Sequence, residues 1–238
     1  MIKEALQYII GLNRPTLEEI GGETYSDKTL CRVSFNPKAE CIKMNTLTSL
    51  VDYIRSGVDE MDEKMLIQVI SPLEVKLISM LDYERTREEL VSVEGFVPEF
   101  RFGSYMDHES FLIALQAKFL PGKDRDLLLR FAGTVKNGTV AEYGDDGVTQ
   151  KATIKKGIAG LEDAIVPNPV TLRPYRTFLE VEQPESSFIF RMKEDEMGGV
   201  RCALFEADGG AWKNAAMKSI REYLEYELAD NKQFTVIS

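Results

Sequence analysis

The chain has 238 residues, of which 44% are hydrophobic and 29% charged, and its 29 basic and 39 acidic residues give a formal net charge of −10 at pH 7. This length suits one large domain or two small ones, and it can bury a substantial core without disulfides or metals. The acidic balance argues against general nucleic-acid binding, because such affinity comes largely from lysine and arginine neutralising phosphates.

The first residues of the chain predict two short helices. Residues 2–12 place apolar side chains at helical spacing, which indicates an amphipathic helix. The Thr16–Glu19 segment resembles a capping box and predicts a second helix, which the following glycine pair would end. Residues 1–28 could therefore form an N-terminal arm or pack on the main body, and residues 29–238 are expected to form a single domain.

The middle of the chain alternates between helical and extended patterns. Two apolar runs separated by Ser71-Pro72 predict a pair of strands joined by a turn. Asp107 precedes an apolar helical pattern and is the expected N-cap of that helix. In chain order we predict a helix over 46–57, strands over 65–70 and 73–79, and helices over 107–120 and 126–135.

The last third reads mostly as strands. An Asp-Gly pair between two alternating runs predicts a hairpin over 139–154. Further expected elements are strands over 175–182, 187–192 and 200–206, a helix over 211–228 capped by Asp208, and a strand over 234–237.

This order predicts an α+β fold with a mainly antiparallel sheet and flanking helices, a helix-rich N-terminal part and a strand-rich C-terminal part. The Gly-, Pro- and Asn-rich region 157–174 could be a boundary within the domain or a loop.

Cysteine usage and hydropathy indicate a cytoplasmic protein. Three widely spaced cysteines, Cys31, Cys41 and Cys202, fit reduced thiols better than a disulfide framework. No stretch approaches the roughly 18 apolar residues that cross a bilayer, and the N-terminus does not resemble a signal peptide, so we expect no membrane partner. The one histidine, His108, lies far from every cysteine, which disfavours a zinc site.

No catalytic set emerges from the sequence, and we expect no cofactor. His108 is predicted to lie on the surface at a helix start, and no serine or cysteine stands in a nucleophile-elbow sequence. Carboxylates offer the remaining chemistry. Glu74-Val75-Lys76 fits half of a metal-dependent nuclease motif, and Glu180 and Glu182 share one face of a predicted strand. Glu74, Glu180 and Glu182 are thus alternative magnesium ligands, although charged solvent-facing strand positions explain them better.

A second set of residues could bind an anionic ligand. The Asp208–Lys213 segment places two glycines before a helix, where backbone N–H groups can bind anions. The competing interpretation is an N-cap turn in which Trp212 anchors the helix in the core. Arginine and tyrosine side chains in 173–176 have the composition of nucleotide-contacting surfaces. The candidate ligand-binding residues are Arg173, Tyr175, Arg176, Trp212 and Lys213.

The stretch Leu172–Met192, LRPYRTFLEVEQPESSFIFRM, resembles the strand pair of the YfdQ-like family of phage and prophage proteins, whose biochemical role is undefined. The order of elements over roughly residues 30–228 is also similar, whereas Glu206–Trp212 does not match the better-known members. The resemblance implies a phage-encoded protein made in a bacterial host cell, and it supplies no catalytic residues.

We therefore expect a non-catalytic binding protein that counteracts host defence by sequestering a nucleotide-type signal or by blocking a host protein. The alternative is an accessory factor, either a binding module or a weak magnesium-dependent nuclease, in phage DNA replication or recombination. Pockets of the first kind often form between protomers, so we expect a homo-oligomer. Residues 1–28 and the strand at 233–237 are its expected assembly elements, because unpaired strand edges invite pairing.

Overall fold

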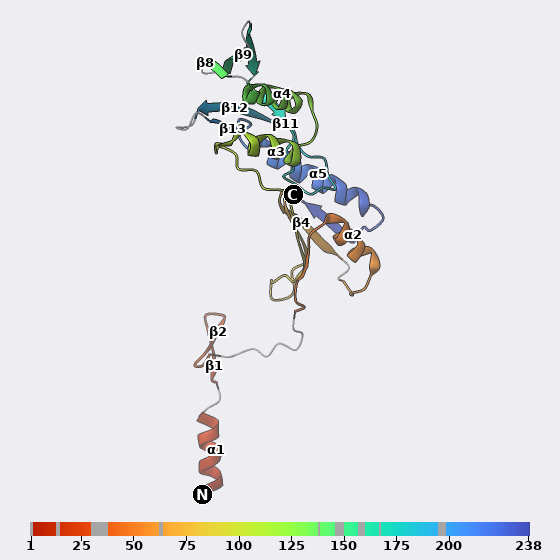
Figure 1. Cartoon of the computed structure of the whole chain (residues 1–238). Coiled ribbons are helices and arrows are strands. Elements are labelled where there is room, and N and C mark those ends of the chain that lie inside the picture. Colours follow the sequence, from red (N-terminus) through yellow and green to blue (C-terminus); the bar gives the residue numbers. More distant parts are fainter. Residues whose placement is uncertain are drawn as a thin grey trace. The chain divides into compact units, whose positions relative to one another are not determined.

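The chain divides into two compact units, Met1–Lys38 and Ala39–Ser238 (Figure 1). The computed structural model describes residues 2–12, 15–29, 38–61, 64–137, 139–145, 150–156, 160–166, 168–194 and 199–238. These ranges hold five helices and fourteen strands, and eight of their ten strand pairings are antiparallel. The predicted α+β class with mainly antiparallel pairing is confirmed, but the strands belong to four sheets rather than one.

The first unit consists of helix α1 (Ile2–Leu12) and a hairpin of strands β1 (Leu17–Ile20) and β2 (Glu23–Ser26). The predicted first helix is confirmed. Its apolar side chains are exposed, Ile2 to 81% and Ile9 to 61%. None of the described side chains of this unit is buried. An isolated short helix or single hairpin is marginally stable in water, so the unit offers apolar surface without a core.

The helix predicted after Thr16 is wrong, because β1 and β2 take its place. The glycines that were expected to end it adopt positive φ, 65° at Gly21 and 86° at Gly22. Two successive residues of this kind form the tight turn whose twist matches paired strands. Thr16 does not cap a helix, since its N–H donates to the Asp27 carboxylate across the hairpin at 2.7 Å.

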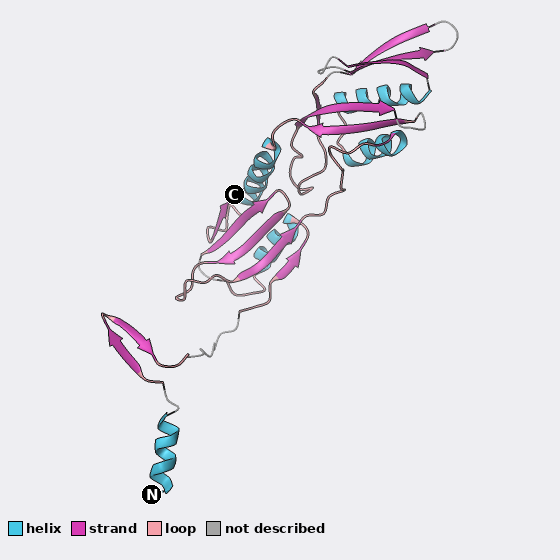
Figure 2. Ribbon diagram, turned by 90° about the vertical axis from the view of Figure 1, so that its left-hand side faces the viewer, coloured by secondary structure: helices cyan, strands magenta, loops and turns pink. Residues whose placement is uncertain are grey.

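The second unit contains a sheet of both parallel and antiparallel strands with helices beside it (Figure 2). It has five strands in the order β14-β4-β5-β6-β3. Its strands are β3 (Ile42–Met44), β4 (Met65–Ser71), β5 (Glu74–Ser79), β6 (Glu89–Glu94) and β14 (Phe234–Ile237). Helices α2 (Leu47–Ser56) and α5 (Ala211–Glu227) pack on the face formed by alternate strand residues and close the first core. The predicted strands around the Ser71-Pro72 turn are confirmed. The predicted C-terminal strand, β14, pairs in parallel with β4 of its own chain, which leaves one edge unpaired.

A second core lies under a four-stranded sheet in the order β11-β12-β13-β7. Phenylalanine dominates it, and Phe111, Phe119, Phe188 and Phe190 are at most 1% exposed. The elements are β7 (Met106–Asp107), α3 (His108–Lys118), α4 (Lys123–Asn137), β11 (Val170–Leu172), β12 (Ser186–Glu194) and β13 (Val200–Glu206).

The predicted hairpin forms part of a three-stranded sheet, β10-β9-β8. Its strands are β8 (Thr139–Asp145), β9 (Gln150–Lys156) and β10 (Gly160–Val166). Residues 146–149 of the predicted turn lie outside the described residues, as do 157–159 and 167 of the predicted linker region, and so does Cys31. Within that region the structure places strands β10 and β11.

The start of α3 corrects one prediction and confirms another. Asp107 is the N-cap, and its side chain accepts a hydrogen bond from the Ser110 N–H at 2.9 Å. His108 is not a surface residue, because it is only 9% exposed and its Nε2 lies 2.6 Å from the Ala132 carbonyl oxygen of α4. The packing of α3 against α4 buries this first helical position.

Gly95 lies in a tight contact that predicts a measurable loss of stability. A Cβ at this position would lie 3.0 Å from side-chain carbons of Leu73 and Phe178. We expect Gly95→Ala to lower the free energy of unfolding by about 1–3 kcal/mol, because the Phe178 ring is itself buried and would have to move. Gly133→Ala, inside α4 with nothing within 4 Å, is the control and should raise stability by about 0.5–1 kcal/mol. Urea unfolding followed by circular dichroism compares them, and equal effects of the two substitutions would refute the contact argument.

Candidate functional site

The strand predicted over Tyr175–Glu182 is wrong, because the chain between β11 and β12 runs as turns and bends. An exposed strand face requires buried and exposed residues to alternate. Here three successive residues are buried, Arg176 at 6%, Thr177 at 0% and Phe178 at 2% exposure. The segment 173–185 is therefore an irregular, partly buried connection, and we call it the crossing segment.

A buried glutamine organises the crossing segment. Gln183 is 3% exposed, and its Oε1 accepts hydrogen bonds from the N–H groups of Arg176 at 2.9 Å and Thr177 at 3.2 Å. Its Nε2 donates to the carbonyls of Thr177 at 3.3 Å, Phe178 at 3.0 Å and Val181 at 3.4 Å. One side chain thus satisfies backbone groups that a strand would have paired with a neighbour.

The crossing segment also contacts the first core. Phe178 and Val181 belong to that core. The Thr177 hydroxyl donates to the Pro72 carbonyl at 2.6 Å. The Glu180 carboxylate accepts from the Thr48 N–H at 3.2 Å in the first turn of α2, where a negative charge is favourable.

Arg176 forms the centre of a buried polar cluster. Its Nη1 donates to Glu206 at 2.9 Å and its Nη2 donates to the Ser186 hydroxyl, which in turn donates to the Asp208 carboxylate at 2.6 Å. Its guanidinium carbon lies 3.9 Å from the centre of a Trp212 ring. Burial lowers the pKa of Arg176 to about 10, so the group stays charged at neutral pH. The Arg176 guanidinium therefore packs against the Trp212 ring, and its charge is balanced within the protein by Glu206.

The turn before α5 differs from the prediction. Gly210, with φ of 83°, occupies the N-cap position, and no side chain caps the helix there. Asp208 is therefore not the N-cap, and it accepts instead from the Gly210 N–H at 3.0 Å. Desolvation raises the pKa of Asp208, but the hydrogen bonds from Ser186 and Gly210 and the Arg176 charge outweigh it and lower the pKa overall. Asp208 is thus a fixed carboxylate beside a half-buried Trp212.

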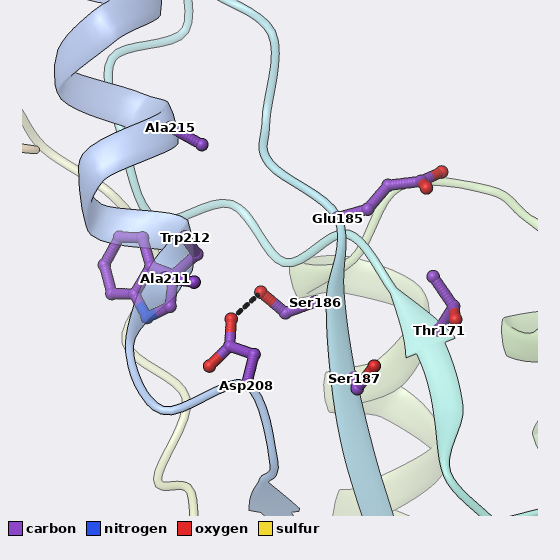
Figure 3. A pocket seen from close by; sticks show the side chains of 8 residues that line it. All are labelled: Thr171, Glu185, Ser186, Ser187, Asp208, Ala211, Trp212 and Ala215. Atoms are coloured by element: carbon purple, nitrogen blue, oxygen red, sulfur yellow. Dashed lines mark hydrogen bonds between the residues drawn. The ribbon is translucent and has the colours of Figure 1, made fainter.

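A cavity of about 280 Å³ opens beside the indole, and we call it the Trp212 cavity (Figure 3). The start of α5 forms one wall, and β11 and β12 form the other. Glu185 and Asp208 bring carboxylates to its lining, which accept hydrogen bonds when ionised, and Thr171 and Ser187 bring hydroxyls, which can donate or accept.

A second cavity of about 410 Å³ lies where α4 begins, and we call it the α4 cavity. Its walls bring together the basic side chains of Lys123, Arg125 and Arg173. Thr171 and Glu185 line both cavities, so the two adjoin. The approach of α4 to β11 is fixed by the Thr171 N–H, which donates to the Asp124 carboxylate at 2.7 Å.

The basic side chains of the α4 cavity differ in how tightly they are held. Arg125 donates to the Phe119 carbonyl at 3.1 Å and lies 3.3 Å from Asp126, so it is largely engaged. Among the described residues, the ion pairs of Arg173 are long, 3.7 Å to Glu182 and 3.9 Å to Glu185, and its side chain is 34% exposed. Such pairs are weak near solvent, so Arg173 can turn to an incoming anion.

The structure separates the five predicted ligand-binding residues. Arg173 lines one cavity and Trp212 lines the other. Arg176 is buried and packs against the Trp212 ring. Lys213 is exposed, and its Nζ lies 5.9 Å from the centre of the indole ring. Tyr175 lines neither cavity, and its N–H donates to the Lys118 carbonyl at 3.0 Å.

The sequence analysis missed Lys123 and Arg125, the two basic residues in the first turn of α4. The available signal was a Pro-Gly pair directly before a helix that opens with Lys-Asp-Arg. It also missed Thr171 and Glu185, for which no local pattern existed.

The three candidate magnesium ligands have separate partners. Glu74 lies 3.7 Å from Lys76, whose Nζ donates to Glu89 at 2.9 Å. Glu180 binds the first turn of α2, and Glu182 approaches an arginine of the α4 cavity. In the part of the chain that the structure describes, no group of three or more His, Cys, Asp or Glu side chains is arranged to hold a metal ion.

Comparison of the chain with protein-family models, with curated proteins and with solved structures finds no match. Among the described residues, no helix has the length and apolar character needed to cross a membrane. The two cavities and the charges that line them are therefore the features that bear on function.

Proposed function

We propose that the chain is a non-catalytic binding protein for a small phosphorylated ligand of the nucleotide type. The observation that supports this is the α4 cavity, which brings Arg173 beside Lys123 and Arg125 of the first turn of a 15-residue helix. Backbone N–H groups at a helix N-terminus attract anions, and arginine and lysine are the usual phosphate-binding side chains. The chain as a whole is acidic, whereas in this lining the three basic side chains outnumber the two carboxylates, Asp124 and Glu185.

Binding without chemistry is favoured by how the polar side chains beside the cavities are used. The Ser186 hydroxyl accepts from the positively charged Arg176 and donates to Asp208, whose lowered pKa makes it a weak base for activating a nucleophile. Arg176 and Glu206 neutralise each other. Sequestering a nucleotide-type signal in a phage-infected bacterial cytoplasm requires only a tight site of this kind.

The first test is isothermal titration calorimetry with ribose 5-phosphate, which carries one phosphate monoester and no base. Arg173→Gln should weaken binding about tenfold, because a charge-assisted hydrogen bond to phosphate is lost. Arg221→Gln is the matched control, since Arg221 lies on α5 and pairs only with Glu225 in the described part of the chain. Added salt should weaken binding by screening the charges. Absence of binding by the wild-type chain, or equal affinity of Arg173→Gln and wild type, would refute the proposal.

The expected homo-oligomer stays a prediction. The exposed apolar residues of α1, Ile2, Leu6 and Ile9, lie at i, i+4 and i+7 on one helix face and favour this helix as the contact between copies. Light scattering on the purified chain measures the subunit number, and a monomer at all concentrations would contradict it.

A further inference from the structure

We infer that the Trp212 cavity is a nucleoside subsite, which takes the base and ribose of a nucleotide whose phosphate lies in the α4 cavity. This inference rests on the proposed function and names its ligand class. The two cavities share Thr171 and Glu185 as a common wall, so one small molecule can occupy both. Their volumes, about 280 and 410 Å³, together match the range of about 300–1,000 Å³ found for small-molecule sites.

The charge balance differs between the two ends of this site and sets the orientation of the ligand. In the α4 cavity Lys123, Arg125 and Arg173 outnumber the carboxylates of Asp124 and Glu185, which favours the phosphate there. The Trp212 cavity shares Glu185 and adds the carboxylate of Asp208, which would repel an anion. The same carboxylate favours hydrogen-bond donors, and a nucleoside supplies donors in its ribose hydroxyls and its amino groups.

The indole of Trp212 supplies the aromatic surface. Base–aromatic contacts stabilise nucleotide binding with little preference for one base. The Trp212 ring is fixed by the Arg176 guanidinium, 3.9 Å from its centre, and Arg176 is fixed by Glu206 and Ser186. Because the ring is already held in one position before a ligand binds, it loses little conformational freedom on binding.

Tryptophan fluorescence tests the subsite directly, because Trp212 is the only tryptophan of the chain. We would titrate the full chain with AMP, ribose 5-phosphate and adenosine, and measure affinity by calorimetry in parallel. AMP should bind about tenfold more tightly than ribose 5-phosphate and change the fluorescence, whereas ribose 5-phosphate should bind without a comparable change.

Ala215→Leu provides a variant that fills the cavity without touching the α4 cavity. Ala215 lines the Trp212 cavity from an exposed position on α5, so the substitution should leave the fold intact. It should remove the extra affinity for AMP and keep that for ribose 5-phosphate. Asn214→Leu, on the same helix and outside the cavity lining, is the control and should bind both probes like the wild type.

The outcomes separate this inference from the proposed function. Equal affinities for AMP and ribose 5-phosphate with unchanged fluorescence would overturn the nucleoside subsite and leave the phosphate site standing. The same holds if Ala215→Leu binds AMP like the wild type. No binding of any phosphorylated probe would overturn both.

Discussion

Gln183→Leu is expected to lower the free energy of unfolding by about 4 kcal/mol, which is a large share of the stability of an ordinary domain. The Gln183 side chain makes five hydrogen bonds to backbone groups of the crossing segment. Leucine fills similar space but leaves two N–H groups and three carbonyls without these partners. Buried polar groups that lose a partner carry the full cost of their removal from water.

Chemical denaturation followed by circular dichroism measures this change. Gln116→Leu is the matched control, because Gln116 lies on the exposed side of α3 and its replacement should change stability by no more than about 0.5 kcal/mol. Hydrogen exchange gives a local reading. The amides of Arg176 and Thr177 should be protected in the wild type and exchange faster in Gln183→Leu. Equal stability of the two leucine variants would contradict the assigned role of Gln183.

Arg176→Met is expected to lower the free energy of unfolding by about 3 kcal/mol, because it removes one partner of a mostly buried ion pair. The loss should stay at the lower end of the range for such pairs, since the Glu206 side chain is 40% exposed and water can solvate its freed carboxylate. Trp212 would also lose the guanidinium that contacts its ring.

The same denaturation measurement tests Arg176→Met against Arg221→Met. Arg221 forms an exposed i, i+4 pair with Glu225, which contributes only about 0.3–0.5 kcal/mol. Tryptophan fluorescence should report a changed environment in Arg176→Met and no change in Arg221→Met. A stability loss no larger than that of Arg221→Met would show that Arg176 does not hold the cluster together.

Local patterns predicted the elements whose contacts are local. The strands on either side of Ser71-Pro72 alternate buried and partly exposed residues, and they pair with each other across the turn. Asp107 was predicted as an N-cap because a cap depends only on the residues three positions further on. The helix expected after Thr16 failed since the same glycine pair can end a helix or turn a hairpin, and the sequence alone does not separate the two.

The crossing segment could not be predicted from alternation. Its residues 175–182 alternate like a strand, but Gln183 supplies the hydrogen bonds of a neighbouring strand, and Phe178 and Val181 pack into the first core. For a similar reason, the sequence predicted only part of the candidate site. Arg173 and Trp212 stood out by residue type, whereas the basic residues of α4 join them only because Asp124 bonds to Thr171, 47 positions away.

The most direct test of the account is backbone-amide chemical-shift mapping by nuclear magnetic resonance during titration with AMP. The account predicts that the largest shifts occur at both ends of one site, at Gly122–Asp124 beside the phosphate, at Thr171 on the shared wall and at Asp208–Trp212 beside the nucleoside. Shifts confined to other surfaces, such as the helix and hairpin of the first unit, or no shifts at high AMP concentration, would contradict it.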